Sequence, residues 1–409
     1  MTASPTGDRV KPARRRDRVR LVVILGALSA FGPLSLDMYL PGLPALTRDL
    51  ATTASAAQLT LSACLLGLAT GQLVAGPISD ALGRRRPLLV GVGAYAIASI
   101  LCAAAPSVVV LIALRFLQGF AGAAGIVIAR AIVRDLHSGT AAARFFSLLM
   151  LVSGLAPILA PIFGGQLLRL TSWRGIFIAL ALIGVALLIA AAFGIRETIH
   201  PEHRQPIGFG ATLATFRRLL GDRAFVRYAL PGGLASASLF TYIAGSSFVL
   251  QDIYGLSPQG FSLAFGGNAL GYVVAGQVNG RLVGRVSPHR LLTGGLIAIG
   301  TGGYALLAAV IFDAGLVGVM AALLTIMASF GFILPNTTAL ALSAHLRTAG
   351  SASALLGVLQ FAIGATVAPL VGIAGRDTAL PMAIVIALCV TAALLTYALL
   401  NRGMAAGAS

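Results

Sequence analysis

Charged residues are scarce in this chain of 409 residues, where Asp, Glu, Lys and Arg make up only 10% of the sequence. Soluble domains carry roughly a quarter charged residues. Hydrophobic residues make up 58%, and the mean hydropathy is +0.94. This composition excludes an ordinary soluble globular protein and predicts a chain that is integral to a membrane.

Lysine, cysteine and histidine are also rare, and each shortage excludes a class of site. The single lysine, Lys11, lies in the N-terminal tail, so the chain has no Gly-rich phosphate loop followed by lysine and is not a P-loop ATPase. The three cysteines lie inside apolar runs and predict buried thiols rather than disulfides. The five histidines fall in predicted cytoplasmic segments, between the apolar runs or at the edge of one, without metal-ligand spacing. We therefore expect no metal, no cofactor and no enzymatic activity, and the lack of a repeated pore motif argues against an ion channel.

Twelve apolar runs are long enough to cross a bilayer, which needs about 20 residues per helix. They lie at residues 21–46, 56–79, 87–105, 108–133, 143–168, 174–194, 225–250, 258–282, 289–312, 315–339, 350–374 and 379–400. We therefore predict an all-α polytopic membrane protein with twelve transmembrane helices.

Basic residues lie almost entirely between these runs. They give a net charge of +17, which would raise nucleic acid as a partner, but they form no continuous basic surface, and we expect none. If the N-terminus is cytoplasmic, 23 of them fall in cytoplasmic segments and 4 in external ones. Because cytoplasmic loops carry an excess of Lys and Arg, both termini are predicted to be cytoplasmic.

The longest polar stretch, about residues 196–223, divides the predicted helices six and six. Two equal halves are typical of transporters built from repeated bundles, which bind substrate between the halves near the bilayer midplane. The expected organisation is a basic cytoplasmic tail at 1–20, a six-helix bundle at 21–194, a cytoplasmic central loop at 195–224, a second six-helix bundle at 225–400 and a cytoplasmic tail at 401–409.

Several motifs, in order along the chain, carry a family resemblance. Residues 76–86 (GPISDALGRRR) resemble the signature loop of the major facilitator superfamily. Residues 36–44 (LDMYLPGLP), 115–119 (RFLQG), 156–165 (APILAPIFGG) and 349–353 (AGSAS) resemble its twelve-helix drug/proton antiporters of the bicyclomycin-resistance (Bcr/CflA) type, which include amphenicol exporters. The chain departs from the commonest form of the third motif by having Ala156 before Pro157.

This resemblance implies a monomeric bacterial inner-membrane antiporter that exports small amphipathic antibiotics, bicyclomycin-like or amphenicol-like, in exchange for protons by alternating access. Its partners would be the drug, protons and membrane lipid. Two other functions stay open at this point. The same fold could carry an endogenous metabolite with protons, or the chain could be a membrane receptor that transports nothing.

The signature loop supplies the candidate gate residues Gly76, Asp80, Gly83, Arg84 and Arg85. Asp80 is expected at the cytoplasmic end of its helix, on the side where the predicted helix 350–374 begins with Ser351 and Ser353. A carboxylate is stabilised by a helix N-terminus. The resemblance implies that this contact bridges the two halves as a latch when the cytoplasmic side is closed. The alternative is that Asp80 and the arginines only cap and orient their own helix.

Asp37 is the only acidic residue well inside a predicted span. An ionisable group at bilayer depth costs about 2.5–3.5 kcal/mol on insertion scales and generally marks an ion or substrate pathway. Asp37 is therefore the candidate proton carrier. The alternative places it at the outer interface as a solvated carboxylate, because Pro41 and Pro44 follow soon.

Arg115 is the complementary charge, about eight residues inside its helix. Asp37 is the only deep acid that could face it, so we predict an ion pair that is released when Asp37 takes up a proton. Alternatively, Arg115 bonds backbone carbonyls and holds the N-terminal bundle together.

The predicted helix 143–168 contains a candidate hinge formed by Gly154, Pro157, Pro161, Gly164 and Gly165. Proline removes a helical hydrogen bond, and small residues spaced by four allow close helix approach. The resemblance places this pattern at the junction between the halves of exporters, although ordinary membrane packing also produces such glycines.

The C-terminal half has no deep acid or base, so its contribution to binding is expected from shape and hydrogen bonds. Aromatic and amide side chains could line a cavity for a neutral or zwitterionic drug. The candidate cavity residues are Tyr39, Tyr242, Phe248, Phe265, Asn268, Asn336 and Phe361.

Overall fold

A computed structural model describes residues 15–137, 139–199, 202, 204, 208–345, 349–372 and 378–405. Within these ranges the regular structure is helical, apart from one isolated bridge between Val283 and Val286. Short polar residues between the apolar runs define several helix starts. Ser257, for example, accepts a hydrogen bond from the amide of Gly260, and Asp222 accepts one from Ala224. Such N-caps satisfy amides that the first turn leaves free.

The helices follow the predicted spans closely. The N-terminal half consists of α1 (Arg15–Ser29), α2 (Phe31–Asp37), η1 (Leu40–Gly42), α3 (Leu43–Asp49), α4 (Ala54–Leu82), α5 (Arg85–Ala103), α6 (Val108–Leu136), α7 (Gly139–Leu167) and α8 (Trp173–Gly194). The C-terminal half consists of α10 (Arg223–Phe248), η3 (Val249–Ile253), α11 (Pro258–Leu282), α12 (Pro288–Ile311), α13 (Gly315–Ser343), α14 (Ala349–Val367), η5 (Ala368–Gly372) and α15 (Leu380–Ala405), and α9 (Phe209–Gly221) lies between the halves in sequence.

The predicted all-α membrane fold is confirmed. In the part of the chain that the structure describes, nine helices are long and apolar enough to cross a membrane, and the pair Arg20–Ser29 and Phe31–Asp49, bent by 44°, makes a tenth. Each of the twelve predicted spans coincides with a helix or with a bent run of helices. The first span is the broken one.

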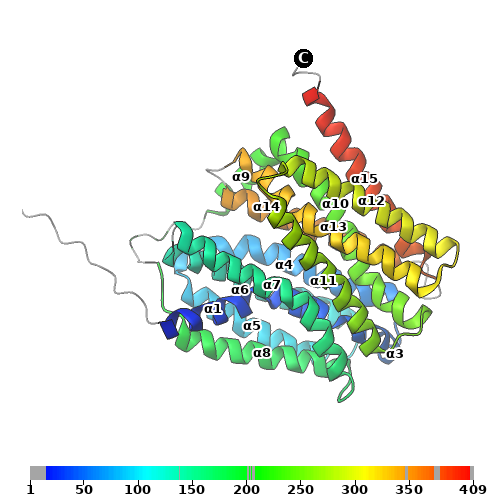
Figure 1. Cartoon of the computed structure of the whole chain (residues 1–409). Coiled ribbons are helices and arrows are strands. Elements are labelled where there is room, and N and C mark those ends of the chain that lie inside the picture. The colour runs from blue at the N-terminus through cyan, green and yellow to red at the C-terminus, as the bar shows by residue number, and fades with distance from the viewer. Residues whose placement is uncertain are drawn as a thin grey trace, which may run out of the picture.

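The two halves repeat one arrangement of helices. In the N-terminal half α4 packs on α6 and α5 packs on α8, and in the C-terminal half α11 packs on α13 and α12 packs on α15. Between the halves, α4 packs on α14 and α7 packs on α11. Figure 1 shows the halves side by side, with α7 and α11 adjacent across the seam. By order in its half, α4 corresponds to α11 and α7 corresponds to α14. The contact of α4 with α14 is therefore equivalent to the contact of α11 with α7, as expected for a repeated bundle.

Some helices approach so closely that their backbones touch. A Cβ atom added at Gly71 would overlap the backbone of Phe120, and one added at Gly119 would overlap the backbone of Cys64. Glycine therefore brings α4 and α6 into direct contact, which is how helices pack tightly in a lipid environment.

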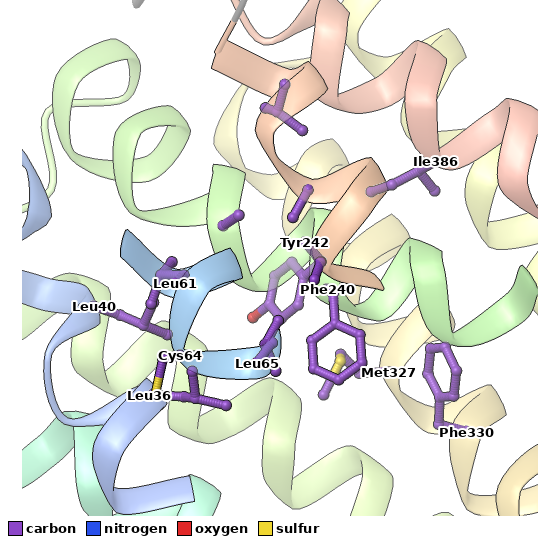
Figure 2. Close-up of a cluster of buried hydrophobic side chains, with 14 of the residues drawn as sticks. Leu36, Leu40, Leu61, Cys64, Leu65, Phe240, Tyr242, Met327, Phe330 and Ile386 are labelled. Carbon is purple, nitrogen blue, oxygen red and sulfur yellow. The ribbon is translucent and has the colours of Figure 1, made fainter. Parts of the chain in front are cut away.

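We distinguish two ends of the helix bundle. The Arg48 end carries α3, the loop 168–172, η3 and η5, and the Arg84 end carries the loop 83–84, residues 195–199, α9 and the start of α14. Figure 1 shows α3 and α9 at opposite ends of the molecule. The main hydrophobic core runs between them and contains side chains of both halves, such as Leu61 and Leu65 of α4 and Phe240 and Tyr242 of α10 (Figure 2).

Candidate functional site

Asp37 is the last residue of α2, where regular α-helical hydrogen bonding gives way to a turn and the segment η1. The 44° bend of this first span lies earlier, between Ser29 and Phe31. Pro41 has no N–H group to donate to the carbonyl of Asp37, so the regular helix cannot continue. The side chain is buried, with 5% of the residue exposed, and it makes no hydrogen bond or ion pair with any residue that the structure describes. It interacts electrostatically with Tyr242 of α10, across the seam between the halves. A solvated carboxylate at the outer interface does not fit this burial.

Arg115 of α6 is completely buried, and it does not pair with Asp37. The guanidinium donates hydrogen bonds to the side-chain oxygen of Gln118 and, over 2.8 Å, to the carbonyl oxygen of Ser35. It also lies 5.0 Å from the ring centre of Tyr39. In this structure the predicted ion pair is therefore absent, because the N-terminal bundle already holds the guanidinium. This arrangement agrees with the alternative interpretation of the sequence, in which Arg115 bonds backbone carbonyls of the N-terminal bundle.

Tyr39 lies inside the N-terminal bundle rather than in a cavity. Its residue is 0% exposed, its ring packs 5.1 Å from that of Phe177, and its hydroxyl pairs with Thr60 over 3.0 Å. We therefore place Tyr39 with Arg115 in the packing around the broken helix and not with the cavity residues.

The predicted cavity residues Tyr242 of α10 and Phe265 and Asn268 of α11 come together through their side chains. The rings of Tyr242 and Phe265 stack with centres 5.2 Å apart and planes 9° apart. The Asn268 amide donates to the Tyr242 hydroxyl over 3.0 Å. Figure 2 shows that hydroxyl pointing toward α4, on the side of Leu61 and Leu65. An aromatic platform with a fixed hydroxyl thus faces the N-terminal half, and in this conformation it is buried, with Tyr242 0%, Phe265 2% and Asn268 1% exposed.

The other predicted cavity residues lie apart from this platform. Phe361 of α14 packs against Phe240 with ring centres 5.8 Å apart, and Phe248 is buried near the end of α10. The Asn336 amide donates to Asn279 over 2.7 Å. The amide group of Asn336 is therefore engaged within the C-terminal half.

The predicted gate loop forms a charge cluster at the Arg84 end. Arg84 donates to Asp135 over 2.9 Å, to Ser79 over 2.8 Å and to Asp80 over 2.5 Å. Arg85 donates to the carbonyl of Ala192, in the last turn of α8, and to that of Ile195, directly after the helix. Gly76 has room for a Cβ atom and packs loosely. In this structure Asp80 thus bonds to Arg84 of its own half and not to the described start of α14. This arrangement agrees with the alternative interpretation, in which Asp80 and the arginines orient their own helix.

Two members of this cluster, Asp135 and Glu197, were not predicted from the sequence. The Glu197 carboxylate accepts hydrogen bonds from the backbone amides of Arg84, Arg85, Thr198 and Ile199. Burial raises the pKa of Glu197, but these four donors outweigh it and hold the pKa below the ordinary glutamate value.

Gly83 makes the approach of this carboxylate possible. Its φ angle is +90°, and an added Cβ atom would lie 2.5 Å from a Glu197 oxygen. The available sequence signal was a glutamate in a short polar stretch directly after an apolar run.

The predicted hinge contains two glycines that closely approach a neighbouring segment and one that does not. A Cβ atom at Gly164 would overlap the carbonyl group of Met38, beside Asp37. One at Gly165 would overlap Ser262 of the other half. A Cβ atom at Gly154 would meet only the Val273 side chain, at 3.8 Å. Pro157 and Pro161 lie inside α7, between Gly154 and Gly164. No cluster of His, Cys, Asp or Glu suited to a metal ion is found in the ranges that the structure describes.

Two halves with repeated helix packing and a buried acid at their seam are typical of membrane transporters, and comparison with known proteins identifies the family. A model described as Major Facilitator Superfamily matches residues 24–369. The chain therefore belongs to the major facilitator superfamily, a family of transporters rather than enzymes, which confirms the predicted family.

Several relatives match along most or much of the chain. YdgK of Bacillus subtilis, named an uncharacterized MFS-type transporter, is 42% identical over 384 residues, or 93% of each chain. A bicyclomycin resistance protein homolog of Haemophilus influenzae is 32% identical over 92% of this chain and 94% of its own. A chloramphenicol resistance protein of Pseudomonas aeruginosa is 32% identical over 68% of this chain and 66% of its own. Among solved structures, the nucleoside transporter NupG aligns with a TM-score of 0.77 at 11% identity, over 94% of this chain and all of that one, which shows a shared fold.

Proposed function

We propose that this protein exports small amphipathic antibiotics, bicyclomycin-like or amphenicol-like, in exchange for protons, with Asp37 as the proton carrier. The observation that carries the proposal is a buried carboxylate without a hydrogen-bond or ion-pair partner among the described residues, located where the broken first helix meets the seam between the halves. The names of the resistance-protein relatives support the substrate class.

An unpaired charge in an apolar surrounding is costly, and uptake of a proton by the carboxylate removes that cost. A change of access between the two sides of the membrane would then let Asp37 bind a proton on one side and release it on the other. One proton that moves inward through 100 mV gains about 2.3 kcal/mol, which supports roughly fifty-fold accumulation of a neutral drug outside.

The charge distribution supports an orientation with the Arg84 end in the cytoplasm. The Arg48 end, where the halves are hydrogen-bonded to each other, then faces outside, and this conformation is closed to the outside. We propose that the latch between Asp80 and the start of α14 belongs to the opposite conformation. A reporter fused after Arg204 should report cytoplasm and one inserted near Ser257 should report the outside, whereas the reverse result would overturn the orientation.

We propose that the drug contacts the platform formed by Tyr242, Phe265 and Asn268. Stacked rings offer apolar area, and the hydroxyl and amide offer hydrogen bonds to a neutral or zwitterionic compound. Arg115 acts indirectly in this scheme: it bonds the Ser35 carbonyl and so positions the helix that ends at Asp37.

The decisive experiment is Asp37→Asn in proteoliposomes with an imposed proton gradient. We expect normal insertion, loss of uphill chloramphenicol transport and retained exchange of drug down its gradient, because Asn keeps the size of the side chain but cannot carry a proton. Asp313→Asn is the matched control, since Asp313 is exposed and has a φ of +47°, which asparagine adopts readily. Normal gradient-driven transport by Asp37→Asn would overturn the proposal. Proton-coupled uptake of a metabolite, with no drug transport by the parent protein, would point to the alternative cargo.

A further inference from the structure

The regular α-helix ends at Asp37, and the buried turn that follows changes the hydrogen bonding of its backbone carbonyls. In a continuous α-helix the carbonyl of Leu40 would accept from residue 44, but that residue is Pro44 and has no N–H group. In η1 (Leu40–Gly42) the Leu40 carbonyl instead accepts the backbone amide of Leu43 in a tighter turn, and its second lone pair is left for a side chain of a neighbouring helix.

Two side chains of the opposite half occupy these carbonyls. The Ser247 hydroxyl, near the end of α10, donates to the Leu40 carbonyl over 2.6 Å. The Gln251 amide, in the π-helical turn η3, donates to the Pro41 carbonyl over 3.3 Å and to the Ser247 oxygen over 2.8 Å. π-helical turns occur frequently at functional sites. Ser247 is fully buried, so water cannot take the place of its hydrogen bond if that bond is lost in the closed state.

The same stretch of chain is held on its other side by α7. Gly164 leaves no space between α7 and the backbone of Met38. The segment Asp37–Gly42 therefore lies between α7 of its own half and α10 with η3 of the other half. Asp37 is only three residues from the carbonyl that Ser247 binds, so a change at either position acts on one short, irregular piece of backbone.

We infer that Ser247 and Gln251 are positioning residues that link closure of the Arg48 end to the state of Asp37. When they bind the Leu40 and Pro41 carbonyls, the Arg48 end is closed and the carboxyl group of Asp37 is held near Tyr242. When the halves separate at this end, both bonds break and the Asp37–Gly42 segment is released. The part of this inference that concerns protonation rests on the proposed function, whereas the closure itself does not.

Ser246 supplies a matched control. It is adjacent to Ser247 and equally buried, but its hydroxyl has no hydrogen-bond partner. Both serine-to-alanine changes remove one buried hydroxyl from the same turn, and only Ser247→Ala removes a hydrogen bond with the other half.

The experiment measures how often the Arg48 end opens. Ala244 is fully buried where α10 meets α4, and its carbonyl accepts a hydrogen bond from Gln58. In a background with Cys64, Cys102 and Cys389 changed to alanine, Ala244→Cys should react with a small maleimide only when the halves separate. We expect Ser247→Ala to raise the alkylation rate roughly fivefold, the change that loss of one hydrogen bond produces. Gln251→Leu should act in the same direction, and Ser246→Ala should change the rate less than twofold. Equal rates for Ser247→Ala and Ser246→Ala would overturn the gate assignment.

A double-mutant cycle tests the link to Asp37. Asp37→Asn mimics the protonated carboxyl, and its effect on the alkylation rate should be at least threefold smaller when Ser247→Ala is also present. In combination with Ser246→Ala its effect should stay unchanged. Additive effects of Asp37→Asn and Ser247→Ala would overturn the link. The transport test of Asp37→Asn is separate, so the proton-carrier proposal can fail while the gate assignment stands.

Discussion

The two ends of the molecule are built from different kinds of bonds. At the Arg48 end, side chains of one half bind backbone carbonyls of the other, and one ion pair joins Arg48 to Asp252 over 3.6 Å. The donor and acceptor residues are Ser55 and Pro369, Gln58 and Ala244, Ser247 and Leu40, Gln251 and Pro41, and Gln259 and Gly165. At the Arg84 end the charged cluster lies within the N-terminal half, and no hydrogen bond or ion pair joins the halves among the residues that the structure describes.

This difference separates bonds that must break during transport from bonds that must persist. A neutral hydrogen bond contributes about 1 kcal/mol net, and charge-assisted bonds are roughly twice as strong. The Arg48 end can therefore open as its neutral bonds exchange with water. The Arg84 cluster keeps α4, α5, α6 and the segment after α8 together as one body, whichever side of the transporter is open.

The largest effect is expected from Arg84→Ala, which tests whether the Arg84 cluster holds one half together. The substitution leaves Asp80 and Asp135 without their shared partner and should cost about 3 kcal/mol of stability, with strongly reduced transport. Arg86→Ala is the control, because Arg86 is exposed and makes no ion pair in the described part of the chain. Thermal unfolding in detergent measures both variants. Equal melting temperatures would show that the cluster does not stabilise this half.

The next largest effect is expected at the Arg48 end, from Gly164→Ala. The added Cβ atom would meet the Met38 backbone, which cannot rotate away as a side chain can, so we expect a loss of about 1–3 kcal/mol and displacement of the segment beside Asp37. Gly154→Ala adds the same methyl group to the same helix in ordinary contact with Val273 and should be tolerated. Both variants are compared by melting temperature and transport rate. Similar losses would mean that the whole hinge, and not the contact at Met38, is sensitive to substitution.

The sequence predicted the fold well because membrane spans and their order follow from hydrophobic length alone. It also indicated the important positions Asp37, Arg115 and Arg84, because a charge within or beside an apolar run is conspicuous. It did not predict which charges meet. Arg115 and Asp37 lie at compatible depths, but the direction in which each side chain points depends on the break at η1 and on the packing of Tyr39, and neither follows from helical periodicity.

Three of the residues that were missed share a physical cause; the fourth, Asp135, binds the Arg84 side chain instead. Glu197, Ser247 and Gln251 all act on backbone groups: Glu197 accepts from amides, and Ser247 and Gln251 donate to carbonyls. A side chain that binds backbone has no partner residue type that could be recognised in the sequence. The prolines at 41 and 44 were the available signal, because they predict carbonyls without helical donors.

A smaller effect is expected from Glu197→Gln, and it depends on pH. Because the folded-state pKa of Glu197 lies below the ordinary value of 4.5, its carboxylate stabilises the folded protein above that value, and the stabilisation is lost as the pH falls through the folded-state pKa. Glu197→Gln should therefore melt at a lower temperature than the parent at pH 7, and the gap should close below about pH 4. A gap that is the same at both pH values would show that the amide hydrogen bonds do not depend on the charge of Glu197.

The smallest effect is expected from the ion pair between Arg48 and Asp252, the one that joins the halves among the described residues. The Arg48 side chain is 63% exposed, so the charges of Arg48 and Asp252 are largely screened by water and contribute about 0–1 kcal/mol. Arg48→Ala should raise the alkylation rate of the Ala244→Cys reporter less than Ser247→Ala does, and adding salt to the parent should reproduce part of that increase. The comparison separates two explanations of how the Arg48 end closes. If charge attraction closes it, Arg48→Ala should raise the alkylation rate more than Ser247→Ala does, and the effect of Arg48→Ala should depend on salt. If hydrogen bonds to backbone carbonyls close it, Ser247→Ala should raise the rate more, and salt should leave the effect of Ser247→Ala unchanged. An Arg48→Ala effect larger than that of Ser247→Ala would place the closing contact in the ion pair and not in the broken helix.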